Sequence, residues 1–457
     1  MEGSHSGLVR CLGKAVWGQP HRGFKSLTLR QMSKFKSLQN INVLIIGSGG
    51  REHTLAWKLK KSPKVKKIFT APGNAGTATL GENILIDISD HQAVIECVKK
   101  NKIDLVVVGP DDALASGIVN SLQEVGIKVF GPTKEASEIE WSKSFAKELL
   151  ERLNIPTAKS KTFTDIVEAK GYIKNHEYPL VIKADGLALG KGVAIVNTHK
   201  EAEQALEEIF VQKIFGPAGE TVIIEEFLQG EEISIHAFCD GETATMFPSA
   251  QDHKPIFDND KGPNTGGMGT VAPVPGVSQD ILNQIKREVV IPIIQELKSM
   301  KRPFRGVLFP GIILTKEGPK VLEFNARFGD PETQSYMRIL KTDLVDIMLA
   351  CIDGALSSVN VEWEDCSACC VVLASKGYPG NYSKGLPITG IAEAEKIADV
   401  IVFHAGIKSE DGRMVTSGGR VLGVSAVGPT LEDARREAYR GVEIVEFEGK
   451  QFRKDIA

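Results

Sequence analysis

The chain lacks the features that would place it among membrane, disulfide-rich or nucleic-acid-binding proteins. Its 457 residues contain no apolar run of about 18 residues, the length that a membrane helix needs. The seven cysteines follow no regular framework, which indicates a reducing compartment. Residues 1–38 carry seven Lys or Arg and one Glu, so the rest of the chain carries a net charge of −9 within the overall −3. An acidic body offers no basic face for a nucleic acid, and we expect neither a nucleic-acid partner nor a membrane.

Residues 1–38 form a basic leader that is poor in acidic residues and rich in Ser, Lys and Arg. This composition is typical of an organelle transit peptide. The alternative is an upstream extension that precedes the translation start, which would then be Met32. No apolar segment of a secretory signal is present. We therefore expect a cytoplasmic protein, with import into an organelle only if the leader is a genuine transit peptide.

After the leader, the strand and helix patterns predict an α/β protein in three parts. From 40 to 140, short apolar runs that end in Gly or Pro alternate with helical patterns, which predicts a Rossmann-like parallel-sheet domain. Ligands bind at the carboxyl ends of such strands, here at 47–53, 72–76 and 109–112. A mixed α and β region spans 141–345. Short strands with glycine turns then predict a small β-rich domain over 346–457.

The segment CSACCVVLAS (366–375) has a CxxCC spacing that is compatible with half of a zinc site. A structural zinc needs four ligands, and no second pair of Cys or His follows this segment. A buried strand is therefore the better interpretation.

Two glycine-rich loops follow predicted strands. The first, IIGSGGREH (45–53), has Gly47 and Gly49 but places Glu52 where a dinucleotide-binding motif has its third glycine. No acidic residue ends the second strand, which disfavours an NAD oxidoreductase. The amides of Gly49 and Gly50 at a helix start, together with Arg51, can still bind a phosphate. The alternative is a plain strand-to-helix turn.

The second loop, VIKADGLALGKG (181–192), differs from a Walker A loop because Gly192 stands where Ser or Thr would hold magnesium. The strand lysine Lys183 before the glycines favours a lid over a nucleotide polyphosphate, and a plain hairpin loop is the alternative. Downstream, TVIIEEFLQGEEISIHAF (221–238) has the pattern of two strands around a glycine-containing turn. Its backbone edge can bind an adenine and Glu232 can bind ribose hydroxyls, whereas the alternative is an acidic hairpin.

The segment VLEFNARFGDPET (321–333) carries the most informative polar side chains. Strand alternation places Glu323 and Asn325 on one face, with Arg327 following on that side. Carboxylate and amide oxygens suit Mg²⁺, and an arginine can neutralise charge on a transferring phosphoryl group. The polar loop 249–269 is long enough to be functional or simply mobile, and Asp252 in it can bind a small substrate.

Together these stretches resemble the ATP-grasp ligases and, more closely, the glycinamide ribonucleotide synthetase family of purine biosynthesis. The resemblance runs from about residue 42 to the C-terminus. It rests on eight stretches in order: GSGGREH, PGNAGT, SKSFAK, KADGLALGKG, EEFLQGEE, QDHK, GPNTGGMG and FNARFGDPETQ. It implies a two-lobed ATP-grasp centre with a small mobile lobe near 145–215. It also implies that ATP phosphorylates the carboxylate of glycine and that 5-phospho-β-D-ribosylamine attacks the glycyl phosphate.

The resemblance further implies a role for each matching residue. The ATP-site positions are Lys143, Lys183, Gly186, Gly190, Lys191, Gly192, Glu225, Glu226, Phe227, Leu228 and Glu232. The substrate-site positions are Gly49, Gly50, Arg51, Glu52, Asn74, Gly76, Asp252, Gly266, Gly267, Arg327 and Asp330. Among them, the positions that match the region for phosphoribosylamine are Gly50, Arg51, Glu52, Asn74 and Gly76, and those that match the loops around glycine and its acyl phosphate are Asp252, Gly266, Gly267 and Arg327. Arg327, Lys183 and Asp252 match catalytic positions, and Glu323 and Asn325 match the metal pair. The chain departs from the family's usual residues at Asp111, Pro255 and Pro310, which affects the substrate loops.

The implied ligands are ATP, Mg²⁺ or Mn²⁺, glycine and phosphoribosylamine, bound by a monomer or homodimer. One alternative is another ATP-grasp enzyme of purine or biotin metabolism, which GPNTGGMG and RFGDPETQ disfavour. The other is a nucleotide-binding protein without catalysis. The presence of Lys183, Glu323, Asn325 and Arg327 disfavours it.

Overall fold

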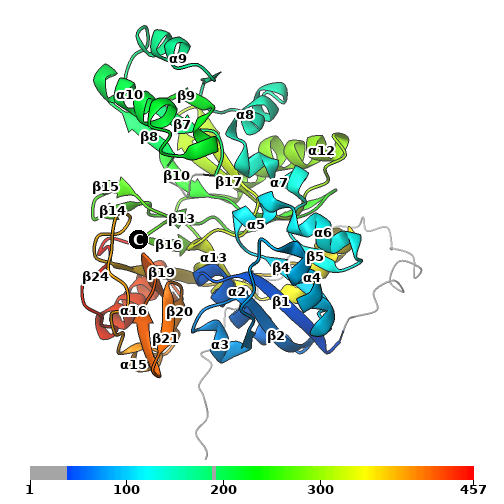
Figure 1. Cartoon of the computed structure of the whole chain (residues 1–457). Helices are drawn as coiled ribbons and strands as arrows, with labels where there is room; N and C mark the ends of the chain where they lie inside the picture. The colour runs from blue at the N-terminus through cyan, green and yellow to red at the C-terminus, as the bar shows by residue number, and fades with distance from the viewer. Residues whose placement is uncertain (1–38, 188–191) are drawn as a thin grey trace, which may run out of the picture.

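The N-terminal part of the chain folds around a five-stranded parallel sheet. In the computed structural model, which describes residues 39–187 and 192–457, the strand order is β3-β2-β1-β4-β5 (Figure 1). The strands are β1 (Ile41–Gly47), β2 (Val65–Pro72), β3 (Glu82–Asn83), β4 (Leu105–Val108) and β5 (Lys128–Phe130). β1 and β4 are apolar and almost wholly buried, as a parallel sheet covered on both faces requires. The predicted parallel-sheet domain is confirmed.

The loops that leave this sheet at its carboxyl edge start side by side. Gly47 pairs with Pro72, and Ile46 pairs with Val108, so β1, β2 and β4 end together. Helix α2 (Gly50–Lys60) begins directly after β1. The Glu52 carboxylate accepts the N–H of Gly49 at 2.6 Å and closes a capping box at the helix start.

A small lobe stands at the top of the molecule (Figure 1). Its antiparallel sheet has the order β6-β9-β7-β8. The elements are β6 (Ser160–Phe163), α9 (Ile166–Ile173), β7 (Leu180–Ala184), β8 (Val193–Val196), α10 (His199–Leu206) and β9 (Val222–Glu226). The lobe has a hydrophobic core of its own, built from the inner faces of these strands and the two helices. Helix α8 (Lys143–Arg152) leads into it.

A second antiparallel sheet has the order β10-β17-β11-β12, with β18 beside β17. Its strands are β10 (Glu231–Ser234), β11 (Ala237–Asp240), β12 (Ala244–Met246), β17 (Arg305–Thr315) and β18 (Gly318–Asn325). A long helical segment beside this sheet consists of α11 (Gln279–Ile285), η3 (Lys286–Val290) and α12 (Ile291–Ser299).

The two strands predicted within 221–238 form, but they belong to different sheets. β9 pairs with β6 and β7, whereas β10 pairs with β17. Residues 227–230 therefore connect the small lobe to the second sheet and do not turn a hairpin. The acidic-hairpin alternative is wrong for this reason.

The C-terminal sheet takes two of its strands from the middle of the chain. Its order is β13-β16-β19-β23-β20, and β24 pairs with β19. The strands are β13 (Gln251–Asp252), β16 (Gly269–Ala272), β19 (Ser367–Ser375), β20 (Val400–His404), β23 (Arg420–Gly428) and β24 (Lys450–Gln451). β19 contains the cysteine-rich segment, so its interpretation as a buried strand is confirmed. Helix α16 (Leu431–Ile444) packs on β19 and β23.

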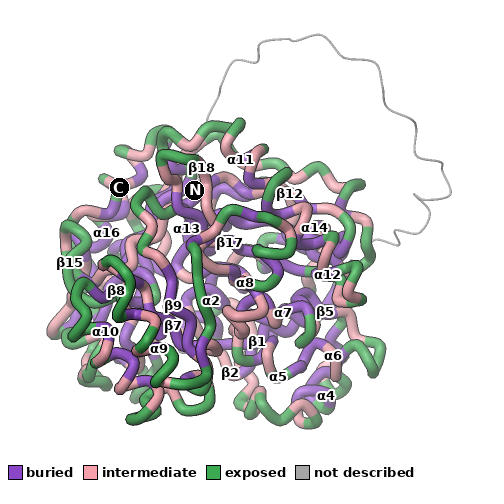
Figure 2. Tube along the Cα trace, turned by 90° about the horizontal axis from the view of Figure 1, so that it is seen from above, coloured by how far each residue is buried: buried purple, intermediate pink, exposed green. Residues whose placement is uncertain are grey.

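Buried segments run through the strands, and exposed segments lie mainly in the outer loops and helix surfaces (Figure 2). One core joins the parallel sheet to the second sheet, and another joins the parallel sheet to helices α13 (Glu332–Ile339) and α14 (Leu344–Asp353). α14 thus packs on β5 and β11, away from the C-terminal sheet. Over the described residues, no helix is both long and apolar enough to cross a membrane.

Candidate active site

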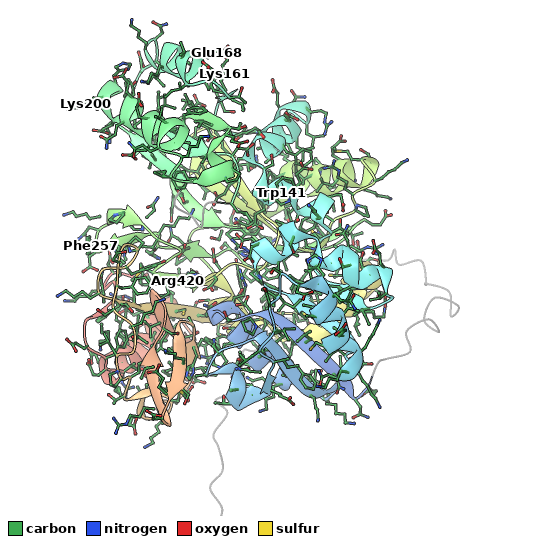
Figure 3. All side chains as sticks on the ribbon, viewed as in Figure 1. Trp141, Lys161, Glu168, Lys200, Phe257 and Arg420 are labelled. Atoms are coloured by element: carbon green, nitrogen blue, oxygen red, sulfur yellow. The ribbon has the colours of Figure 1, made fainter. Side chains whose placement is uncertain are left out.

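A cleft of about 490 Å³ gathers charged side chains from every part of the fold. Figure 3 shows the small lobe, marked by Lys161, Glu168 and Lys200, above the region that carries Arg420. The predicted site residues that line the cleft are Arg51, Lys143, Lys183, Gly186, Gly192, Glu225, Glu226, Phe227, Leu228, Glu232, Asp252, Gly266, Glu323, Asn325, Arg327 and Asp330. Gly190 and Lys191 lie outside the described residues. The cleft therefore brings together predicted residues from segments as far apart as 51 and 330. The described predicted residues that are not among its lining residues are Gly49, Gly50, Glu52, Asn74, Gly76 and Gly267.

Two lysines share one buried carboxylate at the upper wall of the cleft. Glu225 on β9 is 2% exposed and pairs with Lys183 of β7 at 2.9 Å and with Lys147 of α8 at 3.1 Å. Lys143, one helical turn before Lys147, donates to the carbonyl of Gly186 at 2.9 Å. Burial lowers the pKa of both Lys143 and Lys147. Sequence reasoning missed Lys147, although its i,i+4 spacing from Lys143 places both on one face of α8.

An apolar part of the cleft lies next to these lysines. The Glu226 carboxylate accepts the backbone N–H of Lys159 at 3.0 Å. Phe227 and Leu228 continue the chain along the cleft wall. The apolar lining residues near them include Ala158, Val181, Val193, Ile195, Ile313 and Leu322. The flat faces of an aromatic ring such as adenine suit such a wall, and the backbone of 226–228 lies beside it for the polar edge of the ring.

β18 presents the predicted metal ligands as strand alternation requires. Phe324 and Ala326 are buried, whereas Glu323 and Asn325 face the cleft. The Lys254 ammonium lies 3.3 Å from the carboxylate of Glu232 and 3.7 Å from that of Glu323. Burial opposes ionisation of Glu323, but Lys254 and the cleft lysines outweigh burial and lower its pKa. Glu323 is thus held as a carboxylate, which is the form that binds a divalent cation.

Arg327 is fixed by three oxygen acceptors. It lies 3.1 Å from Glu140, and its guanidinium donates to the Asn325 side-chain oxygen at 3.0 Å and to the Phe328 carbonyl at 3.2 Å. Glu140 also accepts the N–H of Ala326 at 2.8 Å. Burial raises the pKa of Glu140, and Arg327 opposes this rise. Glu140 is a second residue that sequence reasoning missed.

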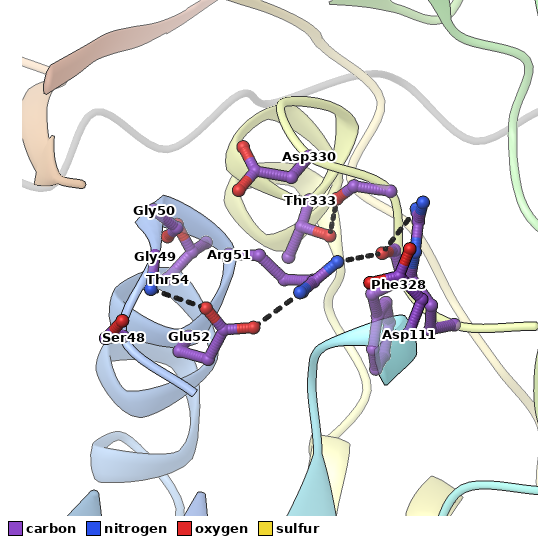
Figure 4. A network of polar contacts seen from close by, with 12 residues as sticks. Ser48, Gly49, Gly50, Arg51, Glu52, Thr54, Asp111, Phe328, Asp330 and Thr333 are labelled. Carbon is purple, nitrogen blue, oxygen red and sulfur yellow. Dashed lines mark hydrogen bonds and ion pairs between the residues drawn. The ribbon is translucent and has the colours of Figure 1, made fainter. Parts of the chain in front are cut away.

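Arg51 enters the cleft from the start of α2 (Figure 4). It donates to Glu52 at 2.6 Å and to the carbonyl of Phe328 at 3.1 Å. Burial alone would lower its pKa, but Glu52 and Asp330 outweigh burial and keep the guanidinium charged. Glu52 itself is 2% exposed and divides its two oxygens between Arg51 and the Gly49 amide. A phosphate bound by the Gly49 amide would compete with Glu52. Arg51 lines the cleft and brings a charged guanidinium to it.

Asn74 and Gly76 lie behind the cleft lining and join two domains. The Asn74 amide donates to the carbonyls of Ser48 at 2.8 Å and His404 at 2.9 Å, and its oxygen accepts the Gly76 N–H at 2.8 Å. A Cβ at Gly76 would lie 2.6 Å from His404. In this structure Asn74 therefore holds the β2 loop against β20, and its predicted substrate role stays a prediction.

Asp252 and Glu332 form a carboxyl pair in the cleft. Glu332 is 3% exposed and accepts the Ser234 hydroxyl at 2.8 Å. Burial, followed by the proximity of Glu332, raises the pKa of Asp252 well above its ordinary value. Gly267 has φ +109 and packs so closely that a Cβ there would lie 2.4 Å from the Asp252 carboxylate.

The three departures from the family pattern occupy different places. Asp111 lines the cleft near Arg51 and Glu140. Pro255 opens β14 (Pro255–Phe257), and its carbonyl accepts from Arg453. Pro310 lies within β17, opposite Phe324. Only Asp111 of the three is part of the cleft lining.

Paired antiparallel lobes around a cleft of lysines and carboxylates define an ATP-grasp ligase. The chain belongs to the phosphoribosylglycinamide synthetase family, whose N, ATP-grasp (A) and C domain models match residues 41–140, 141–333 and 368–457. A phosphoribosylamine–glycine ligase of Rhodopirellula baltica is 48% identical over 427 residues, covering 92% of this chain and 98% of the relative. The human trifunctional purine biosynthetic protein adenosine-3 is 50% identical over 91% of this chain and 41% of its own length.

Solved structures agree with this assignment. The phosphoribosylamine–glycine ligase of Thermotoga maritima aligns with a TM-score of 0.80 at 35% identity, covering 91% of this chain and 100% of that one. The biotin carboxylase domain of Hydrogenobacter thermophilus 2-oxoglutarate carboxylase aligns with a TM-score of 0.69 at 15% identity. At that identity the second likeness concerns the fold alone.

Proposed function

We propose that this protein catalyses the ATP-dependent ligation of glycine to 5-phospho-β-D-ribosylamine, with glycinamide ribonucleotide, ADP and phosphate as products. The match to all three family domains in order supports this activity. So does the printed name of relatives that are 48% identical over nearly their whole length. The observation that carries the proposal is the cleft, which unites the lysines, carboxylates and arginines of those domains.

The reaction proceeds in two steps through glycyl phosphate. A carboxylate oxygen of glycine attacks the γ-phosphorus of ATP, and ADP leaves. The amine of phosphoribosylamine then attacks the carbonyl carbon of glycyl phosphate, loses a proton and expels phosphate. Lys143, Lys183 and Arg327 all line the cleft. We propose that the two lysines neutralise nucleotide phosphates and that Arg327 stabilises the transferring phosphoryl group.

The residues of β18 fit a divalent cation. Glu323 is ionised, Asn325 offers an amide oxygen, and magnesium takes few protein ligands when substrate phosphates supply the others. Among the described residues no group of three or more His, Cys, Asp or Glu side chains forms a metal cage. We propose that Glu323 and Asn325 hold Mg²⁺ or Mn²⁺, which when bound neutralises charge on the polyphosphate.

The arginine network of the N-terminal domain supports a place for phosphoribosylamine. Arg51 is charged, lines the cleft and donates to the carbonyl of Phe328 (Figure 4). A phosphate there would form charge-assisted hydrogen bonds with the guanidinium. The cytoplasmic location and the monomer or homodimer expected from the sequence stay predictions.

ADP release from ATP and Mg²⁺, measured with glycine and freshly made phosphoribosylamine together and singly, tests the proposal. Release that requires both substrates is expected. Release with glycine alone would mean that glycyl phosphate forms and is lost to water. ATP binding without ADP release under any condition would contradict the ligase activity. Glu323→Gln should abolish turnover, with Glu317→Gln as a control on an exposed carboxylate outside the cleft lining.

A further inference from the structure

Two side chains of the C-terminal domain bind the two backbone polar groups of one residue in the substrate loop, Gly266. The Tyr378 hydroxyl accepts the N–H of Gly266 at 3.0 Å. The Arg420 guanidinium donates to the carbonyl of Gly266 through Nη1. Both polar groups of Gly266 are thus bound from a domain that lies more than a hundred residues away along the chain.

Arg420 also reaches a second substrate segment. The same Nη1 donates to the carbonyl of Asp330 at 2.6 Å and lies 3.5 Å from its carboxylate. Burial would lower the pKa of Arg420, but Asp330 and the other acids of the cleft outweigh it. The permanently charged guanidinium therefore ties the 265–267 loop to the turn at 330.

The Arg420 guanidinium packs against Gly266 on the side where a side chain would lie. A Cβ at Gly266 would lie 3.0 Å from Cζ and 3.2 Å from Nη2 of Arg420, so the two groups are already in close contact. The next residue, Gly267, packs closely against the Asp252 carboxylate. A shift of the Gly266 peptide would therefore move the wall against which Asp252 is packed.

We infer that Arg420 and Tyr378 are positioning residues for the amino-acid side of the cleft, which they set by fixing the Gly266 peptide and the Asp330 turn. The inference rests on the proposed function. Arg420 and Tyr378 hold residues 266 and 330, whereas Lys183 and Lys147 are held by Glu225 on the small lobe. Loss of either positioning residue should therefore weaken glycine use and leave nucleotide binding intact.

The test measures kcat and the KM for glycine, phosphoribosylamine and ATP, together with ADP affinity. Tyr378→Phe deletes one oxygen and should raise the KM for glycine about fivefold to tenfold, the effect of one lost hydrogen bond. Arg420→Gln should raise the KM for glycine further. Arg420→Lys should raise it less than Arg420→Gln does, because lysine keeps the positive charge but lacks the planar guanidinium that donates to two acceptors. The KM for ATP and the affinity for ADP should stay within about twofold of wild type, below the effect of one hydrogen bond.

Matched controls come from the same domain. Tyr382→Phe alters a ring 6.3 Å from Tyr378, and Arg413→Lys alters an exposed arginine. Both should behave as wild type. A merely structural role would change all three KM values and the thermal midpoint together, and that result would overturn the inference. An unchanged KM for glycine in Tyr378→Phe would also overturn it, and this mild variant decides the question if the Arg420 variants do not fold.

Turnover by the wild-type enzyme distinguishes a failure of this inference from a failure of the proposed function. If wild type releases no ADP with glycine and phosphoribosylamine, the ligase activity is wrong and the positioning role falls with it. If wild type turns over and the variants match it, only the positioning role is wrong.

Discussion

Replacing Glu225 by Gln should expose how strongly the cleft lysines depend on one carboxylate. Glu225 is 2% exposed, and the side chains of Lys147 and Lys183 are 11% and 8% exposed. Both ammonium groups take this carboxylate as an ion-pair partner, at 3.1 and 2.9 Å. The substitution keeps the shape of the side chain and removes the charge that compensates the two lysines.

The expected cost follows from the burial of all three groups. Removing one partner of a buried ion pair leaves an uncompensated charge and costs about 3 kcal/mol or more. Little of this is lost to solvent screening, because none of the three side chains is more than 11% exposed. We therefore expect the small lobe, which has its own core, to open about a hundredfold more readily in the ligand-free variant.

The loss should depend on pH in a defined direction. Burial lowers the pKa of Lys147 in the folded protein, and Glu225 opposes that shift. Without Glu225 the folded pKa falls further below the unfolded value, so the unfolded chain binds more protons between the two values. Stability then rises with pH across that window. The difference between Glu225→Gln and wild type should therefore shrink as the pH rises from about 7 to 9.5, toward the ordinary lysine pKa.

Hydrogen exchange of β7 and β9 amides, measured from about pH 7 to 9.5 with and without ADP, is the assay. Exchange rates must be corrected for the intrinsic effect of pH. Glu226→Gln is the matched control, because Glu226 is the next residue on β9 and accepts from the Lys159 backbone instead. ADP phosphates should restore part of the protection. Equal protection in the two variants, or a deficit that grows with pH, would refute this account of the lysine pair.

Three further predictions concern the N-terminal and C-terminal sides of the cleft. Gly109→Ala should destabilise the protein by about 1–3 kcal/mol in denaturant unfolding, because its Cβ would lie 2.0 Å from the Glu52 carboxylate; a neutral result would contradict the close packing. Glu140→Gln should lower kcat/KM about tenfold or more by releasing Arg327, with ADP affinity unchanged, and an unaltered kcat/KM would count against that role. Burial lowers the pKa of His404 from 6.5 to about 4. Stability should therefore fall as the pH drops from 6.5 to about 4, because the unfolded chain binds the proton more readily. The thermal midpoint of His404→Asn should decrease less over this pH range than that of wild type.

The sequence by itself determined the local elements and much of the ATP side of the site. The apolar run NVLIIG (42–47) ends in glycine and precedes a helical pattern, which predicted a strand followed by a helix, and β1 and α2 are found there. Strand alternation placed Glu323 and Asn325 on one face because side chains two residues apart share a face of a strand. These features depend on residues that are close together in the chain, so the local sequence pattern is sufficient to predict them.

Tertiary structure alone decided which sheets the strands join and which side chains hold the substrate loops. β9 and β10 are four residues apart yet belong to different sheets, and no local pattern separates this arrangement from a hairpin. Glu140, Tyr378 and Arg420 reach the cleft through contacts that span up to 186 residues of chain. Their sequence neighbourhoods are those of ordinary helices, turns and strands. Their partners are fixed only when the packed domains bring distant backbone groups within hydrogen-bond distance, and that geometry has no signature along the chain.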